Sequence, residues 1–208
     1  MESRGNPSVV ALVTMKTLKQ LLKKKRIIRV IGFDDAPFKK DSSFANVSGV
    51  VCAGTRFEGM VWGTVQKDGD DATSVLSQLL LQSKFYEQVH LVLIDGLAVA
   101  GFNLIDLPEL SRRLERPCVS VMRKLPDMIA IEKALSNLPN TLERLALIQK
   151  AGTIHVQQPF YFQVVGENPE IVGEVLQQLT HTGHVPEALR LAHLIGKAVI
   201  TGESGKRA

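Results

Sequence analysis

The hydrophobic positions of this chain fall into two patterns: unbroken apolar runs, and longer stretches in which apolar residues recur every three or four positions. Unbroken runs are typical of buried strands, whereas the three- and four-residue spacing is typical of helices that bury one face. The runs predict strands over residues 27–33, 90–94, 117–122 and 160–165. Segments 44–55 and 56–66 are rich in Val, Gly and aromatic residues, and their length and spacing predict a pair of antiparallel strands. The spaced stretches predict helices over residues 70–81, 106–114, 128–138, 141–150, 169–180 and 187–200, with Thr141 as the cap of the fourth.

The order of these elements constrains the topology. Three strands come first with no room for helices between them, so they pair as antiparallel neighbours. The next two strands each follow a helix, which makes them parallel additions through crossover connections. We therefore predict an α/β fold of the ribonuclease H-like type. Its mixed sheet has five strands, three antiparallel and then two parallel, flanked by helices; a Rossmann-type sheet would need helices between the first strands.

Length and composition favour a single domain. The chain has 208 residues, a length that suits one globular core, and no linker or repeat divides it. Residues 1–30 hold eight Lys and Arg and one Glu, so they carry +7 while the remainder carries −3. We predict a basic N-terminal arm over residues 1–26, a domain over 27–201 and a flexible tail over 202–208. Such an arm either binds a polyanion or is simply solvated.

Several protein classes are excluded. No apolar run approaches the ~20 residues that span a bilayer, and no signal peptide precedes the basic segment, so we expect no membrane association and a cytoplasmic location. Cys52 and Cys118 lie in apolar surroundings typical of reduced core residues. No CxxC or HExxH pattern indicates a zinc site.

Two predicted strands end in aspartate, Asp34 and Asp95. Open α/β sheets place their ligands at the carboxyl ends of the strands, where these side chains would meet. Asp71, or alternatively Asp70, opens the intervening helix and could reach the same edge. Three converging carboxylates need a divalent cation, and Mg²⁺ (with Mn²⁺ as a substitute) suits oxygen ligands and supports phosphodiester hydrolysis. A single strand-end aspartate can instead form a turn or cap a helix.

Other polar groups are candidates for the same edge. Arg123 and Lys124 follow the last parallel strand and could neutralise phosphate charge, or belong to an ordinary basic loop. On the last helix, Glu187 and Arg190 can pair, while Arg190 and His193 share a face. Arg190 and His193 could reach a phosphate or the acidic cluster. Alternatively, Arg190 forms only a surface ion pair with Glu187, and His193 is a half-buried histidine without a ligand.

Glycine and amide residues could allow close approach of a base or backbone. Gly96, Gly101 and Asn103 belong to a small apolar connection after Asp95, and we treat them as candidate substrate-binding residues. The same segment could equally be a packed connection.

Six motifs, spread in order over residues 25–200, resemble the endonuclease dU family, a distant relative of endonuclease V. They are Gly32–Phe38, Asp68–Thr73, Asp95–Gly96, Ala100–Asn103, Arg123–Met128 and Pro186–His193.

The resemblance implies a ribonuclease H-like fold and magnesium-dependent cleavage of nucleic acid near a deaminated base. Asp34 and Asp95 match metal-binding aspartates of endonuclease V, and His193 matches a late member of its metal site. Arg123 or Lys124 falls where that enzyme carries its catalytic-loop lysine. The glutamate that follows an arginine in endonuclease V has no counterpart here, and Asp71, or Asp70, is the substitute by spacing. An equivalent of the wedge that opens a damaged base pair is also absent from the sequence.

The sequence therefore predicts a Mg²⁺-dependent endonuclease that cleaves nucleic acid near uracil or hypoxanthine. DNA is favoured over RNA as the substrate, and DNA repair is the expected process. Asp34, Asp71 and Asp95 would hold the ion with support from Asp35. One alternative is a nucleic-acid-binding protein of the same fold without turnover, and another is a phosphohydrolase acting on small molecules. The oligomeric state does not follow from the sequence.

Overall fold

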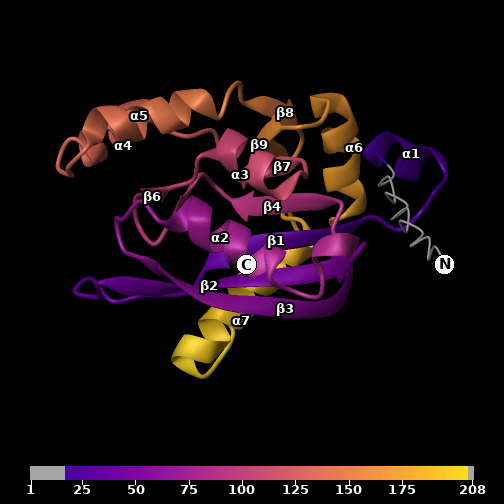
Figure 1. Ribbon diagram of the computed structural model, residues 1–208, viewed down its shortest axis with the longest axis horizontal. Helices are drawn as coiled ribbons and strands as arrows, with labels where there is room; N and C mark the ends of the chain where they lie inside the picture. Colours follow the sequence, from indigo (N-terminus) through magenta and orange to yellow (C-terminus); the bar gives the residue numbers. More distant parts are fainter. Residues whose placement is uncertain (1–16, 206–208) are drawn as a thin grey trace, which may run out of the picture.

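A computed structural model describes residues 17–205 of the chain (Figure 1). Its centre is a seven-stranded sheet in the order β3-β2-β1-β4-β7-β9-β8. The strands are β1 (Arg29–Asp35), β2 (Phe44–Ala53), β3 (Arg56–Gln66), β4 (Leu91–Asp95), β7 (Cys118–Met122), β8 (His155–Gln157) and β9 (Phe160–Val165).

The sheet is mixed, as the element order predicts. Strands β1, β2 and β3 pair antiparallel, and β4 and β7 extend the sheet parallel to β1. The prediction of five strands is wrong, because β9 joins β7 antiparallel and β8 joins β9. The sequence indicates β9 as a strand but does not show where it pairs. It gives no sign of β8, which is three residues long and only half-buried.

Helices cover both faces of the sheet (Figure 1). One face packs against α1, α6 and α7, and the other against α2 and α3. Helices α4 and α5 form a pair at one end of the molecule. The bounds are α1 (Leu18–Lys23), α2 (Ala72–Leu81), α3 (Leu107–Leu114), α4 (Met128–Leu135), α5 (Thr141–Lys150), α6 (Pro169–Gln178) and α7 (Glu187–Thr201), with a 3₁₀ turn η1 at Tyr86–Gln88.

Alternation along the strands divides the core into two layers. Val30, Leu91 and Leu93 point toward α6 and α7, whereas Ile31 and Val92 point toward α2 and α3. Because successive side chains of a strand face opposite sides, the parity of each residue determines which helices it meets. This rule also decides where the strand-end aspartates point.

Helix α7 lies very close to the sheet. An added Cβ on Gly32 of β1 would come within 2.7 Å of the Ala188 carbonyl carbon, so only glycine fits there. The Ser48 hydroxyl of β2 donates a 2.8 Å hydrogen bond to the Ala192 carbonyl, one turn further along α7. These contacts fix the height of α7 above the end of β1.

Helix α1 changes the prediction of an N-terminal arm. Residues 17–26 belong to the predicted arm, but they include α1. Leu18 and Leu21 of this helix are buried in the core beside α6, so this part of the chain packs on the domain. Residues 1–16 of the predicted arm and 206–208 of the predicted tail lie outside the described residues. The capping prediction for α5 is also corrected, because Asn140 rather than Thr141 occupies the N-cap position.

Cys52 and Cys118 are both free thiols and both buried, as predicted. Burial raises the pKa of the Cys52 thiol to about 12. Among residues 17–205, no helix combines the length and the apolar character needed to cross a bilayer.

Candidate active site

Asp34 and Asp95 lie side by side at the carboxyl ends of two parallel strands. Phe33 of β1 pairs with Ile94 of β4, so the next residue of each strand shares the same level. Phe33 and Ile94 face α2. Because side chains alternate along a strand, Asp34 and Asp95, one position further, face α7. The juxtaposition predicted from the strand ends is thus present.

The two carboxylates form the floor of an open cavity of about 640 Å³. Its walls come from the turn after β1 and from the segment after β7. The lining residues are Asp34, Asp35, Ala36, Pro37, Phe38, Asp95, Gly96, Val121, Met122, Arg123, Lys124 and His193. Of the predicted polar groups, the cavity gathers Asp34, Asp95, Arg123, Lys124 and His193, which come from four separate parts of the chain.

Asp34 is paired with the histidine of α7. Its side chain is 8% exposed, and its Oδ2 lies 2.9 Å from His193 Nδ1. The hydrogen bond to Asp34 raises the pKa of His193, while burial and Arg123 oppose this rise. The other ring nitrogen, Nε2, is left for a ligand in the cavity.

Asp95 is paired with Arg123, whose Nη2 donates to its Oδ2 over 3.2 Å. Burial, followed by the negative charge of Asp34, raises the pKa of Asp95 to about 6, although Arg123 and His193 act in the opposite direction. Two neighbouring carboxylates are harder to ionise together than apart. A cation between them would remove this penalty.

Asp35 is the third acid at this edge. It accepts a 2.7 Å hydrogen bond from the backbone N–H of Ala100. Burial and the charge of Asp34 raise its pKa to about 6. The sequence gives Asp35 only a supporting role, yet this residue, and not a residue of the next helix, joins Asp34 and Asp95 in lining the cavity.

Asp71 does not line this cavity. Its carboxylate accepts hydrogen bonds from the Gln66 N–H and, at 2.6 Å, from the Asn103 side-chain amide, which anchors the start of α2. Asp70 faces a different cavity beside α3 and α5. The expected convergence of an acid from this turn is therefore absent, because the Asp71 carboxylate is bound by the Gln66 N–H and the Asn103 side chain.

The predicted substrate-binding residues have mixed placements. Gly96 lines the acidic cavity, with φ at +79°. Asn103 is fully buried and links the Gln66 carbonyl, Asp71 and the Ala72 N–H. These contacts make Asn103 part of the packed connection rather than of the cavity wall.

Gly101 and Arg190 also lie away from the acidic cavity. Gly101 has φ at +87°, and an added Cβ would come within 2.4 Å of the Asp68 carboxylate. Arg190 pairs with Glu187 one turn earlier on α7, with Nη2 and Oε1 2.5 Å apart. The bond lowers the pKa of Glu187 and raises that of Arg190.

An apolar cavity of about 280 Å³ adjoins the acidic one, and the two share Gly96 and Met122. Its other walls are mainly apolar side chains of α4, α5 and the nearby loops, with Gln163 of β9 as a polar member. The Gln163 amide nitrogen donates to the Gly152 carbonyl. No sequence motif indicates this cavity, because its walls come together only when α4 and α5 pack beside β9.

In residues 17–205, no three acidic, histidine or cysteine side chains are arranged as a ready-made metal site. The acids of the cavity are instead held by neighbours within the chain, His193 for Asp34 and Arg123 for Asp95.

The mixed sheet, the helices on both faces and the acids at the ends of β1 and β4 define an α/β protein of the ribonuclease H-like class. The family follows from comparison with known proteins: the model of the Endonuclease dU family matches residues 26–200, and the chain belongs to that family. A UPF0215 protein of Methanothermobacter thermautotrophicus is 37% identical over 186 residues, which cover 86% of this chain and 91% of the relative.

Solved structures share the fold. The crystal structure of a protein of unknown function from Archaeoglobus fulgidus matches with a TM-score of 0.80 at 34% identity, covering 84% of this chain and 99% of that chain. Endonuclease V of Ciona intestinalis, in complex with a 24-mer DNA containing an inosine followed by a ribo-adenosine, matches with a TM-score of 0.53 at 16% identity. The match covers 81% of this chain and 84% of that chain. The relationship to endonuclease V expected from the motifs is thus present at the level of the fold.

Proposed function

We propose that the protein is a divalent-metal-dependent endonuclease that hydrolyses phosphodiester bonds of nucleic acid. The observation that carries this proposal is the pairing of Asp34 and Asp95 at one level and on one face of two parallel strands, with Arg123, Lys124 and His193 around them. Acids on the floor and cations on the wall of one cavity suit a cation and a phosphate bound together.

The donor set fits Mg²⁺ or Mn²⁺. Magnesium is usually held by one or two carboxylates and completes its shell with water and substrate phosphate, so it needs no cage of three protein acids. Asp34 and Asp95 would hold the ion, with Asp35 behind them. When bound, such an ion supplies Lewis-acid activation of water and of the phosphate.

The remaining side chains would act on the substrate. Arg123 and Lys124 would bind the non-bridging phosphate oxygens and offset the charge that builds up during the displacement. His193 is oriented by Asp34 at Nδ1, so that Nε2 can hold or transfer a proton beside the scissile bond. With an ion held by Asp95, Arg123 would be available to bind phosphate.

The adjoining apolar cavity supports recognition of a base next to the cut. A volume of about 280 Å³ with apolar walls accommodates a flat ring, and Gln163 offers an amide oxygen. A deaminated base such as hypoxanthine or uracil, in DNA rather than RNA, is the substrate that we propose. The endonuclease V of Ciona intestinalis is in complex with a DNA that contains an inosine followed by a ribo-adenosine, which supports the choice of a deaminated base.

The test is cleavage of single- and double-stranded oligonucleotides that contain uracil, hypoxanthine or no lesion, with Mg²⁺, Mn²⁺ or EDTA. We expect ion-dependent cleavage by the wild type and a loss of at least 100-fold for Asp34→Asn or Asp95→Asn, consistent with removal of a metal ligand. Asp41→Asn, in the exposed turn after β1, removes the same charge outside the cavity and should retain activity. Cleavage that persists in EDTA, or in both variants, would disprove the proposal.

A second candidate is a nucleic-acid-binding protein without turnover. The pairing of Asp34 with His193 and of Asp95 with Arg123 favours it, because these contacts occupy carboxylate oxygens that a metal ion would need. Such a protein would bind the same oligonucleotides in EDTA, with an affinity that falls steeply with salt, and would give no product with any ion.

A further inference from the structure

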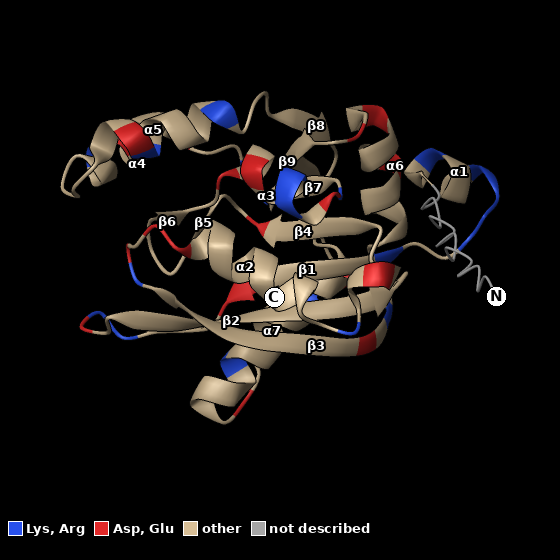
Figure 2. Ribbon diagram, viewed as in Figure 1, with Lys and Arg blue, Asp and Glu red and all other residues tan. Residues whose placement is uncertain are grey.

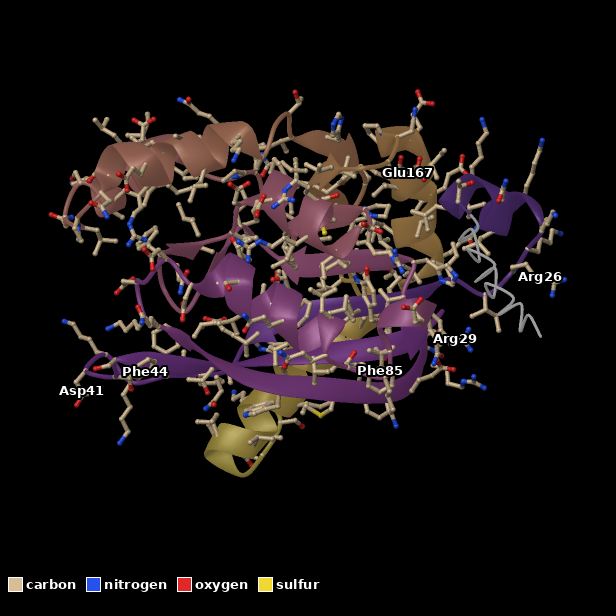
Figure 3. All side chains as sticks on the ribbon, viewed as in Figure 1. Arg26, Arg29, Asp41, Phe44, Phe85 and Glu167 are labelled. Carbon is tan, nitrogen blue, oxygen red and sulfur yellow. The ribbon has the colours of Figure 1, made fainter. Side chains whose placement is uncertain are left out.

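A second cavity with cationic walls lies at the other end of β1. It is open, has a volume of about 560 Å³, and is lined by Leu21, Lys25, Arg26, Ile27, Arg29 and His90. Residues 17–30 contain six Lys and Arg and no acid. Figure 2 shows this blue segment on α1 and in the turn that follows it. Figure 3 shows Arg26 and Arg29 at one end of the molecule and Asp41, beyond the carboxyl end of β1, at the other.

His90 gives this cavity a fixed hydrogen-bond donor. Its Nδ1 accepts a 3.0 Å hydrogen bond from the Arg29 backbone N–H, so the proton of the neutral ring is on Nε2. Burial, with the charges of Arg29 and Arg116 nearby, lowers the pKa of His90 and so favours the neutral ring. An imidazole N–H among cations is suited to an anion.

The Arg29 guanidinium is only partly used within the described residues. Its Nε donates to Glu58 Oε2 over 2.8 Å, and Glu58 also binds Arg56. Within residues 17–205, no other acid pairs with Arg29, and none pairs with Lys25 or Arg26. The cluster therefore keeps an excess of positive charge.

Lys25 occupies a backbone position that favours glycine. It has φ at +48° after the last turn of α1. Its N–H donates to the Leu22 carbonyl, and the Arg26 N–H donates to the Leu21 carbonyl, the paired bonds of a Schellman motif. The backbone of a lysine there is strained relative to glycine, and the Lys25 side chain places a positive charge at the cavity.

From these observations we infer a second phosphate-binding site, formed by Lys25, Arg26, Arg29 and the Nε2–H of His90, that holds the backbone of the same nucleic acid outside the cleaved segment. This inference rests on the proposed function for the class of ligand. β1 has seven residues, which at ~3.3 Å each separate the two sites by about 20 Å. At ~3.4 Å per base pair along the axis of a duplex, a double-stranded ligand reaches both sites with about six base pairs.

The test is binding of a 20-nucleotide single strand in EDTA, measured by fluorescence anisotropy over a range of salt concentrations. We expect Arg26→Gln to weaken binding and to lower the slope of log affinity against log salt by about 0.7, the value for one lost contact with single-stranded nucleic acid. Lys133→Gln, an exposed lysine of α4, is the charge-matched control and should leave the slope unchanged.

The variant Lys25→Gly separates the effect of the lysine charge on binding from an effect on stability. It should raise Tm, because glycine relieves the positive φ, and yet weaken binding as Arg26→Gln does. Glu115→Gly relieves a similar positive φ of +51° at the end of α3 and should raise Tm without weakening binding. If Lys25→Gly and Arg26→Gln both bind with unchanged affinity and an unchanged salt slope, the second phosphate-binding site is disproved while the proposed function stands. A wild type that binds no oligonucleotide would overturn it together with the proposed function, whereas binding without cleavage would overturn only the endonuclease.

Discussion

Asp34 and Asp35 have different surroundings although they are neighbours in the sequence. Asp34 points toward α7 and meets His193, while Asp35 points to the opposite face and accepts a hydrogen bond from Ala100. Asp71 resembles them in the sequence, but its carboxylate is bound by Gln66 and Asn103. The environment, and not the residue type, separates a candidate ligand from a structural acid.

This difference predicts opposite phenotypes for two aspartate variants. Asp35→Asn should lower ion-dependent cleavage by at least tenfold with little loss of stability, because the amide can still accept the Ala100 hydrogen bond. Asp71→Asn should cost about 1–2 kcal/mol of unfolding free energy, because it removes a charged acceptor from two donors, and should leave cleavage by the folded protein nearly unchanged. Urea titrations and cleavage rates of the two variants check this. The reverse pattern would restore Asp71 as the third acid.

At the scale of elements, the position of α7 decides whether the acids have a partner. This helix comes from the end of the chain and covers the strand that begins the domain, so His193 and Asp34 meet across 159 residues. The close approach depends on Gly32, where a side chain would collide with the backbone of Ala188 and Leu189. Backbone of a packed helix cannot yield as a flexible side chain can.

Gly32→Ala should therefore destabilise the protein by about 1–3 kcal/mol, the usual cost of overpacking a core. It should also slow cleavage, since α7 and His193 are displaced from Asp34. Gly173→Ala is the matched control in α6, where the atoms nearest to the added methyl belong to the Gln157 side chain, at 3.1 Å and beyond, and not to backbone. The control should be neutral or up to about 1 kcal/mol more stable, because alanine favours a helix. Equal unfolding midpoints for the two variants would contradict this account of the α7 contact.

At the scale of the whole molecule, the acidic cavity costs stability that a ligand can restore. Asp35 and Asp95 both have a pKa of about 6, above the usual 3.8, so the folded protein binds protons more tightly than the unfolded chain. Their contribution to stability is full below pH 4 and is lost as the pH rises through 6. His193, with a raised pKa, has the same sign and loses its contribution above pH 6.5.

Replacement of one acid should reduce this loss. Asp95→Asn should be more stable than the wild type at pH 8 by about 2 kcal/mol and nearly equal to it at pH 4, because the amide carries no charge for burial to penalise or for Asp34 to repel. Urea unfolding in EDTA at both pH values measures the difference, and Asp41→Asn serves as a control for charge alone. A constant difference between wild type and Asp95→Asn across this range would show that Asp95 is not under electrostatic strain. Mg²⁺ should stabilise the wild type more than the variant at pH 8.

The local pattern of the sequence determined most elements and the acids at their ends. Hydrophobic runs locate β1, β4 and β7, and helical spacing locates α2, α6 and α7 within a few residues, because burial of one or both faces leaves a period in the sequence. Asp34 and Asp95 could be identified as partners since parallel neighbours end at the same edge. Strand β8, helix α1 and the pairing of β9 with β7 required the structure, because nothing local specifies which edge a late strand joins.

Tertiary structure decided which polar groups share the cavity. Asp35 replaced Asp71, and Asn103 and Gly101 became parts of a packed connection, since hydrogen bonds to backbone groups far along the chain cannot be read from spacing. The apolar cavity beside α4 and the cationic cavity around His90 likewise exist only where separate segments meet. The sequence by itself determined most of the strands and helices and the two strand-end aspartates, because these depend on local periodicity. The partners of those aspartates were determined by packing, which joins residues according to their distance in space.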